Sequence, residues 1–459
     1  MSVRINIHRG QYEYFTNFDI VQGTVELHLN SSESVSSVVV KIEGISKSLC
    51  YTEPGSGKTR SKTPVQELHK VLYLTEPVFP DDQLRKTSTA NSFTLPPGKH
   101  SWAFKFQIPV NNDCKNELRT KPTIGSILQG PHAHEQRHVQ QILPPSMSGS
   151  DEVWVRYFVK ATVIRPSMLA INRREYVPFI FLPIEAPRAE PSSGSRSFFV
   201  RRQYTLSLEE EGRRSSLKSF FTEKARKDGD TIALEVRMPN PPTLVPGLPV
   251  NMDIMGFFES NFNDNQLAIT KIAVYLCITT KVRAAGLRRA IGNRMTCFTE
   301  DFNVPFVFHK DLNQPAAILQ LIKTKPLIVA TDVAPTFSTC NVARTYELEV
   351  AVTVANTRNK SRELIVLNCP VTILSGVQAP PPQENRPALP DRPDHGSSSM
   401  TTREPAGKDN DLPTYTEAVE VGAPSSRPRI PVMSSGTALR TRTSYRVGQD
   451  YYEYPNHDT

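Results

Sequence analysis

The stretch Trp102-Ala-Phe-Lys-Phe-Gln-Ile108 places an apolar side chain at every second position. Successive side chains of a β-strand point to opposite faces of a sheet, so this pattern predicts a strand with one face in a core. The same period of two recurs along most of the chain, at 25–29, 38–42, 155–163, 232–238, 272–278, 346–354 and 364–373.

Helical periodicity is nearly absent from the sequence. One short helix candidate lies at 217–225, and 315–323 is ambiguous between helix and strand. Many strands separated by turns, without a strand–helix rhythm, favour antiparallel sandwiches over an α/β fold. The sequence therefore predicts an all-β protein.

The length of 459 residues predicts more than one domain, because a single hydrophobic core stops growing near ~250–300 residues. Two strand-rich blocks, 1–186 and 197–376, are separated by a short polar linker at 187–196. From 377 to 459 the chain is rich in Pro, Ser, Thr and charge. Such a composition buries too little apolar surface to offset the entropy of ordering, so we expect a disordered Pro-rich tail.

Neither a signal peptide nor a membrane span is expected. The amino terminus has no apolar core segment, and apolar stretches such as 177–184 are far shorter than the ~20 residues that a spanning helix needs. The 6 cysteines contain no CxxC pair and are expected as buried thiols of a reducing compartment. The net charge of +8 favours anionic surfaces, but it is spread along the chain without aromatic–basic clusters, which disfavours nucleic-acid binding.

Three motifs resemble those of a known protein family. Ser92–Pro109, in which a Pro-Gly turn leads into the aromatic strand, resembles the signature of arrestin N-terminal domains. Leu143-Pro-Pro-Ser146, followed by 155–163, is similar to the next strand of that family. The pair 231–236 and 245–250 resembles the opening of the arrestin C-terminal domain. The resemblance covers roughly the first 376 residues and implies two arrestin-like β-sandwich domains before the tail.

A tail motif narrows the resemblance. Asp411-Leu-Pro-Thr-Tyr-Thr-Glu-Ala418 resembles the PY motif of α-arrestins, the fungal-type arrestin-related trafficking adaptors, with Leu412 at its first position instead of Pro. Pro413 fixes its own φ at about −65° and pre-orders an extended segment. Such a segment fits the groove of a WW domain, in which a pocket binds the Tyr415 side chain. The resemblance implies that Leu412, Pro413 and Tyr415 bind the WW domains of a HECT-type ubiquitin ligase.

The family resemblance also implies a function. It implies an adaptor, not an enzyme, that recruits the ligase to plasma-membrane transporters or receptors and promotes their ubiquitination and endocytosis. Such a protein is cytoplasmic and is recruited peripherally to the plasma membrane and endosomes. An arrestin-fold coat or scaffold component of endosomal sorting, without ligase recruitment, remains the alternative. The sequence shows no GxSxG, HExxH or kinase motif, and we expect no cofactor.

Two further candidates concern phosphate and partner binding. Ser215 and Ser216 follow two arginines, so a phosphate there would find cationic partners, while a solvated basic turn explains the same residues. Pro387-Ala-Leu-Pro-Asp-Arg392 matches the PxxPxR pattern of SH3 ligands, which also arises as filler in proline-rich tails.

A basic loop is expected to make weak contact with anionic lipid through Lys58, Arg60 and Lys62. Within it, Gly55-Ser-Gly-Lys-Thr59 looks like part of a phosphate-binding loop. The first glycine of the GxxxxGK[ST] motif falls on Thr52, however, so a solvated loop is favoured.

Metal binding is not expected from the spacing of ligand types. His132, His134 and His138 are close in sequence, but no cysteine or carboxylate cluster completes a zinc pattern around them. The sequence thus predicts no metal site.

Overall fold

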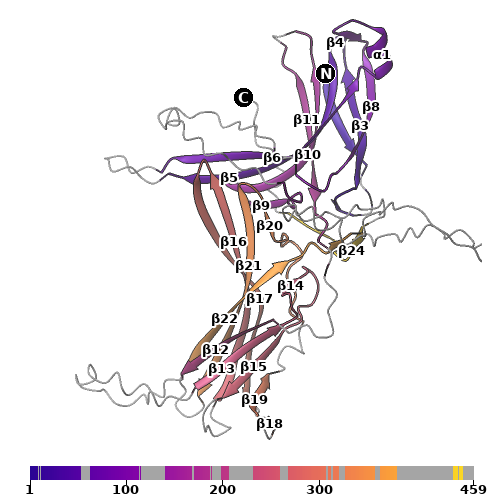
Figure 1. Ribbon diagram of the computed structural model, residues 1–459. Helices are drawn as coiled ribbons and strands as arrows, with labels where there is room; N and C mark the ends of the chain where they lie inside the picture. The colour runs from indigo at the N-terminus through magenta and orange to yellow at the C-terminus, as the bar shows by residue number, and fades with distance from the viewer. Residues whose placement is uncertain are drawn as a thin grey trace, which may run out of the picture. The chain divides into compact units, whose positions relative to one another are not determined.

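The computed structural model describes residues 1–8, 10, 12–52, 62–112, 114, 140–167, 170–186, 188, 198–205, 231–258, 267–305, 309–311, 314–319, 326–356, 362–379, 438–442 and 444–447. The chain divides into one unit of Met1–Gln378 with Leu439–Thr459 and a second unit of Ala379–Ala438. All described strands belong to the first unit, and β1 to β22 form two sandwiches (Figure 1).

The first sandwich contains strands β1 to β11. Its smaller sheet has the order β1-β3-β8, with strands at Ser2–Ile7, Ile20–Leu29 and Gly98–Gln107. Its larger sheet has the order β2-β11-β10-β5-β6, with strands at Tyr14–Phe15, Arg173–Phe181, Val153–Ile164, Ser37–Tyr51 and Pro64–Phe79. β9 (Met147–Ser150) pairs with β10, and β4 (Glu33–Val35) pairs with β7 (Phe93–Leu95).

The alternating stretch of the sequence lies on β8 and just beyond it. Phe104, Phe106 and Ile108 are buried, whereas Lys105 and Gln107 are exposed, as the period of two predicts. Trp102 is half-buried and packs beside another aromatic ring of the first sandwich. One face of this strand therefore forms part of the first core.

The second sandwich contains strands β12 to β22. One sheet has the order β12-β13-β15-β19-β18, with strands at Phe198–Thr205, Thr231–Met238, Asp253–Phe258, Gln314–Leu319 and His309–Asp311. The other has the order β14-β22-β21-β16-β17, with strands at Thr243–Leu244, Arg362–Ile373, Val342–Asn356, Leu267–Ala284 and Leu287–Pro305. β20 (Phe337–Ser338) pairs with β21. The ambiguous 315–323 stretch thus contributes β19, a strand.

Alternate residues of β13, β16, β21 and β22 meet in one apolar cluster. Leu234, Leu276, Val350 and Leu367 are fully buried in it. Burial of one Leu or Val side chain stabilises a fold by roughly 1.5–3 kcal/mol, so a cluster of this size is sufficient to hold the two sheets together. The structure confirms the predicted all-β fold with two sandwich domains.

The turn between β16 and β17 is a tight two-residue hairpin. Ala285 and Gly286 have φ of 46° and 82°, and the flanking Ala284 and Leu287 are paired. Positive φ at both central residues matches the twist of the flanking strands, but it costs Ala285 more than it costs glycine. This hairpin reaches the first sandwich, where the ends of β16 and β17 contact β5 (Figure 1).

A short helix, α1 (Asp82–Thr87), lies between β6 and β7 and was not expected from the periodicity. The Asp81 side chain accepts a hydrogen bond from the Leu84 N–H at 2.7 Å, which satisfies one of the amides left open at the helix start. A helix this short has no repeating apolar positions. The N-cap residue Asp81 is therefore the feature of the sequence that indicates it. No helix in the described part of the chain has the length and apolar character of a membrane span.

The expected tail is not separate throughout from the sandwiches. β23 (Val377–Gln378) pairs with β24 (Leu439–Arg440), and residues up to 447 continue along the first unit. At these residues the structure differs from the disorder that the composition predicts from 377 onward. The rest of 380–459 and the helix candidate at 217–225 lie outside the described residues, so disorder there and the domain boundaries remain predictions.

Two leucines of β22 provide a matched test of the strand register. Leu367 is fully buried and Leu364 is 59% exposed. We expect Leu367→Ala to lower the free energy of unfolding by about 2–5 kcal/mol, because it leaves a cavity, and Leu364→Ala to change it by less than about 0.5 kcal/mol. Denaturant titration of both variants checks this, and equal midpoints would contradict the register.

Candidate functional site between the two sandwiches

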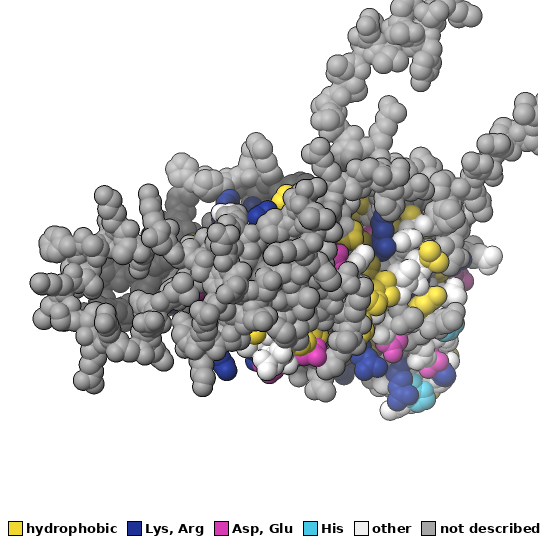
Figure 2. Space-filling model, turned by 90° about the horizontal axis from the view of Figure 1, so that it is seen from below, with side chains coloured by type: hydrophobic (Ala, Val, Ile, Leu, Met, Phe, Trp, Pro, Cys, Tyr) yellow, Lys and Arg dark blue, Asp and Glu magenta, His cyan; other side chains and the backbone are white. Residues whose placement is uncertain are grey.

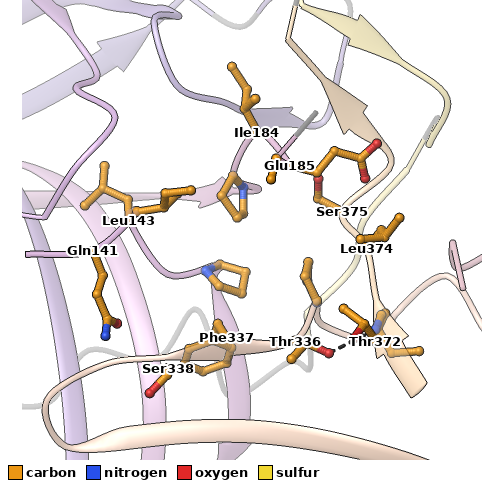
Figure 3. A pocket seen from close by; sticks show the side chains of 16 residues that line it. Gln141, Leu143, Ile184, Glu185, Thr336, Phe337, Ser338, Thr372, Leu374 and Ser375 are labelled. Carbon is orange, nitrogen blue, oxygen red and sulfur yellow. Dashed lines mark hydrogen bonds between the residues drawn. The ribbon is translucent and has the colours of Figure 1, made fainter. Parts of the chain in front are cut away.

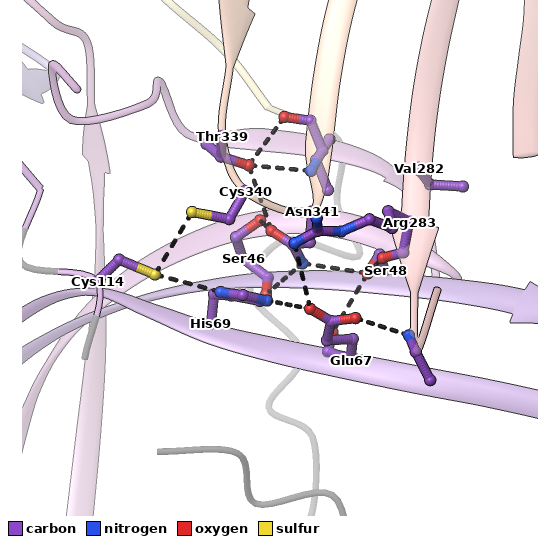
Figure 4. A network of polar contacts seen from close by, with 12 residues as sticks. Ser46, Ser48, Glu67, His69, Cys114, Val282, Arg283, Thr339, Cys340 and Asn341 are labelled. Atoms are coloured by element: carbon purple, nitrogen blue, oxygen red, sulfur yellow. Dashed lines mark hydrogen bonds and ion pairs between the residues drawn. The ribbon is translucent and has the colours of Figure 1, made fainter. Parts of the chain in front are cut away.

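Polar side chains fill the contact between the sandwiches (Figure 4). β5 and β6 of the first sandwich meet the β16–β17 hairpin and the start of β21 of the second. Asn341 is buried here: its Nδ2 donates to the Ser46 carbonyl and to Ser48 Oγ, both at 3.1 Å, and its Oδ1 accepts from Ser46 Oγ at 2.8 Å. One side chain of the second sandwich is therefore fixed by three hydrogen bonds to the first.

Glu67 on β6 is the charged centre of this contact. Its side chain is 1% exposed, and its Oε2 accepts a hydrogen bond from the Ala285 N–H of the hairpin tip at 2.8 Å. The Arg283 guanidinium lies 3.9 Å from Oε1, and His69 Nε2 hydrogen-bonds the same oxygen. Because the partners come from both sandwiches, the buried carboxylate is satisfied only when they are docked.

The protonation of Glu67 and His69 follows from these contacts. Burial by itself raises the pKa of Glu67, but hydrogen bonds from His69 and Ala285 outweigh it and hold the pKa below its usual value. Burial lowers the pKa of His69, but Cys340 and Glu67 favour its charged form and raise the pKa to about 8. Glu67 is therefore ionised near neutral pH.

An outer ion pair borders the same contact. Arg289 of β17 pairs with Glu152, which accepts a hydrogen bond from the Tyr51 hydroxyl at 2.5 Å. The hydrogen bonds from Tyr51 and Arg289 lower the pKa of Glu152. The Arg289–Glu152 pair is more exposed than Glu67. Exposed ion pairs contribute only about 0–1 kcal/mol to the free energy of unfolding, so we assign this pair a minor part in holding the sandwiches together.

The C-terminal segment 438–447 also contacts the two sandwiches. Thr441 donates its backbone N–H and its hydroxyl to the Gly376 carbonyl, each at 2.8 Å. Gly376 has a φ of 76°, and a Cβ there would lie 2.9 Å from the Arg442 Cβ. Glycine is therefore required where the segment crosses.

Two arginines anchor the returning segment. Arg440 pairs with Asp19 at 2.6 Å and donates to the Tyr14 carbonyl at 3.1 Å, which attaches it to the first sandwich. Arg442 is 2% exposed and donates to the Thr331 carbonyl and, at 2.9 Å, to the Val333 carbonyl of the second. The segment thus contacts both sandwiches within three residues.

Arg442 is a buried cation held by carbonyl groups and a ring. Burial lowers its pKa, but a guanidinium stays charged in proteins. The Tyr445 ring centroid lies 4.4 Å from its Cζ, and the Tyr445 hydroxyl donates to the Ser146 carbonyl of the first sandwich. The cation–π contact and the carbonyl bonds compensate part of the desolvation cost.

A pocket of about 350 Å³ opens at the same junction (Figure 3). It is lined by Leu143 and Ile184 of the first sandwich and by Phe337 and Leu374 of the second, with Glu185 at its border. The Gly376 N–H donates to Glu185 Oε2 at 3.3 Å. The volume is at the lower end of small-ligand pockets and suits one or two side chains of a peptide.

The charged side chains do not gather into one field on the face shown in Figure 2. Among the described side chains there, lysine and arginine lie interspersed with acidic groups. The net charge of +8 is therefore not concentrated on the visible part of this face.

Most of the residues singled out in the sequence lie outside the described residues. These are Leu412, Pro413 and Tyr415 of the PY-like motif, Ser215 and Ser216, Lys58 and Arg60, the histidines His132, His134 and His138, and the 387–392 stretch. Lys62 is described and is exposed near the end of the β5–β6 hairpin, where the Thr52 N–H donates to the Thr63 carbonyl at 3.0 Å.

The sequence reasoning missed the residues of the interface itself. Glu67, Asn341 and Arg442 show no pattern, because their partners lie far away along the chain: Asn341 is separated from Ser46 by 295 positions. A weak signal exists at 439–445, the sequence Leu-Arg-Thr-Arg-Thr-Ser-Tyr, which lacks proline inside a proline-rich region.

Arg442 provides a test of the returning segment. We expect Arg442→Ala to raise the amide exchange rate of Thr441 by about 10–150-fold, because hydrogen bonds from a charged group contribute about 1.5–3 kcal/mol each. Hydrogen exchange with mass spectrometry measures this. Arg446→Ala is the matched control, since Arg446 is exposed. Equal exchange in both variants would show that Arg442 does not anchor the segment.

Comparison with known proteins agrees with this architecture. Residues 3–182 match the family described as arrestin (or S-antigen), N-terminal domain. A protein of Lachancea thermotolerans named "Arrestin-related trafficking adapter 10" is 26% identical over 175 residues, which cover 33% of this chain and 38% of that protein. The match spans little more than a third of that relative. The predicted signature at Ser92–Pro109 falls within the matched region, so residues 3–182 are similar to the arrestin N-terminal domain.

Proposed function

We propose that this chain is a trafficking adaptor that brings a WW-domain HECT-type ubiquitin ligase to plasma-membrane transporters or receptors and promotes their ubiquitination and endocytosis. The observation that carries the proposal is the arrestin N-terminal domain at 3–182. The relative from Lachancea thermotolerans is named a trafficking adapter, and we extend that role to this chain. In this proposal the chemistry occurs on the ligase, so the chain itself is not an enzyme and needs no cofactor.

The ligase contact is assigned to Leu412, Pro413 and Tyr415. A proline-stiffened extended segment loses little conformational freedom on binding, and an aromatic residue beside it supplies an anchor for a pocket. The rest of the chain then serves to bring the ligase close to its substrate. Joining two binding functions in one chain raises the effective concentration of one partner near the other.

The returning segment changes how the motif is attached. β23 ends at Gln378 and β24 begins at Leu439, so the chain leaves the first unit before the motif and rejoins it after the motif. The ligase-binding residues would thus be connected to the arrestin sandwiches on both sides. A force or a competing partner acting on the motif would act on the β23–β24 pair as well.

Cargo contact and location form part of the same proposal. β6 and β17 stand at the ends of their sheets in the observed strand order, and strand edges can accept an additional strand from a cargo segment. The adaptor would be cytoplasmic and would reach the plasma membrane and endosomes through its cargo, with weak help from anionic lipid. Nucleic acid is not a proposed partner.

The lipid contact is assigned to Lys58, Arg60 and Lys62, which lie in the sequence between β5 and β6; of these, Lys62 is described and is exposed. Exposed cations near an anionic surface contribute about 1 kcal/mol each, and salt screens them. We expect binding to phosphatidylserine vesicles to weaken as salt rises from 50 to about 500 mM. Sedimentation with vesicles measures it, and salt-independent binding would contradict an electrostatic contact.

Tyr415 gives the sharpest test of ligase recruitment. We expect Tyr415→Ala to weaken WW-domain binding about thirtyfold, the equivalent of about 2 kcal/mol for an aromatic anchor. Leu412→Pro should strengthen binding, because it stiffens the free peptide. Isothermal titration of the full chain with an isolated WW domain measures both. Tyr451→Ala, a tail tyrosine outside the motif, is the matched control.

The result also separates the two candidate functions. If Tyr415→Ala binds the WW domain and supports cargo turnover like the unchanged chain, the ligase-adaptor mechanism is wrong. The arrestin-fold coat or scaffold reading predicts that outcome, because it requires no capture through Leu412–Tyr415.

A further inference from the structure

Three metal-ligand side chains from distant parts of the sequence meet at the contact between the sandwiches. His69 lies on β6, Cys114 follows β8 in the first sandwich, and Cys340 precedes β21 of the second. Their ligand atoms all lie within 4.8 Å of one another (Figure 4). His69 is buried, and the two cysteines are partly buried.

Two of the three distances between the ligand atoms are close to those of a tetrahedral metal site, and the third is at most 4.8 Å. His69 Nδ1 lies 3.2 Å from Cys114 Sγ, and Cys114 Sγ lies 3.8 Å from Cys340 Sγ. A tetrahedral Zn²⁺ ion with Zn–S of about 2.3 Å and Zn–N of about 2.0–2.1 Å separates its ligand atoms by about 3.5–3.8 Å. The distances of the Cys114 sulfur to His69 Nδ1 and to the Cys340 sulfur are each within a few tenths of an ångström of these values.

Glu67 orients the histidine for such a role. Its Oε1 hydrogen-bonds His69 Nε2, which leaves Nδ1 to contact Cys114 Sγ, with Cys340 Sγ within 4.8 Å. Histidine ligands of zinc commonly donate their other ring N–H to a carboxylate, which fixes the tautomer and the ring plane. The carboxylate is itself held by the Ala285 N–H at 2.8 Å, so the ring position is determined by two layers of contacts.

The ligand types select the ion. Two thiolates and one imidazole form a soft donor set, which favours zinc over magnesium or calcium, because the latter prefer oxygen. The two negative charges of the thiolates also balance the two positive charges of a divalent cation. The partly buried site therefore carries no net charge when these three groups are together. Three protein ligands leave one tetrahedral position for a water molecule.

We propose that His69, Cys114 and Cys340 bind a Zn²⁺ ion that joins the two arrestin sandwiches. The ion holds the loop before β21 against β6. Close by in sequence, Asn341 already donates to the Ser46 carbonyl of β5 at 3.1 Å. Binding to the docked arrangement alone stabilises that arrangement in proportion to the logarithm of zinc concentration over Kd. The ion therefore fixes one relative placement of the strands that meet at Glu67.

Cobalt reports this site directly, because Co²⁺ takes the same ligands as Zn²⁺ and absorbs light. The full chain is purified with a reductant, freed of metal by a chelator and titrated with Co²⁺. We expect one equivalent to give a sulfur-to-cobalt charge-transfer band and the visible bands of tetrahedral cobalt, and Zn²⁺ to displace both. Zn²⁺ alone should raise the Tm of the metal-free protein.

Variants separate this site from other thiols. Cys114→Ser and Cys340→Ser should each diminish the charge-transfer band and weaken binding, and Glu67→Gln should weaken it about 10–100-fold. Cys277→Ser is the matched control, because Cys277 lies on β16 and contacts Glu349 outside the cluster. Circular dichroism of the metal-free variants verifies that each has folded.

Three outcomes overturn the proposal. One is the absence of a charge-transfer band in the unchanged chain with Co²⁺ at micromolar concentration. A second is equal affinity for Co²⁺ in folded Cys340→Ser and the unchanged chain, which would place the metal elsewhere. The third is a Cys114–Cys340 disulfide, found by mass spectrometry in protein purified with reductant, since it would remove both thiolates.

Discussion

The docking of the two sandwiches depends on one buried negative charge. Removal of a carboxylate from water costs several kcal/mol unless donors replace the lost water. The donors to Glu67 are His69 of the same strand, the Ala285 N–H and the more distant Arg283 of the second sandwich. Separation of the sandwiches would remove two of these partners, so the charge favours the docked state and disfavours partial opening.

The same constraint explains a strained turn. Ala285 has a φ of 46°, a conformation that glycine adopts at little cost and alanine does not. The hairpin presents the Ala285 N–H to Glu67 in this conformation, and the paired Ala284 and Leu287 fix the turn from both sides. The hydrogen bond to the buried Glu67 carboxylate compensates for the positive φ of Ala285. The geometry of the turn also determines where β16 and β17 contact β5.

The fold could be predicted from the sequence far better than the site could. Burial of Phe104 or Val350 follows from the alternation of apolar and polar residues within a few neighbouring positions, so it can be predicted from one strand alone. The interface has no local pattern: Asn341 and Ser46 become partners only after both sandwiches have folded. The tail was predicted from average composition, which conceals the proline-free segment 432–454 that contains Arg442 and Tyr445. Composition describes long stretches, whereas anchoring needs only a few side chains.

The returning segment and the Glu67 contact are two solutions to the same physical problem. Arg442 places a buried positive charge beside carbonyl groups of the second sandwich, while Tyr445 hydrogen-bonds the first. Glu67 takes partners from both sandwiches, and the returning segment bonds the second sandwich through Arg442 and the first through Arg440 and Tyr445. Both contacts are therefore most stable when the sandwiches are docked. The two sets of partners have no residue in common. Release of the segment would therefore remove its own bonds without removing a partner of Glu67, and loss of the Glu67 contact would leave the bonds of the segment in place. On the proposed function, a partner that binds between β23 and β24 could act on one of these contacts while the other keeps the sandwiches together.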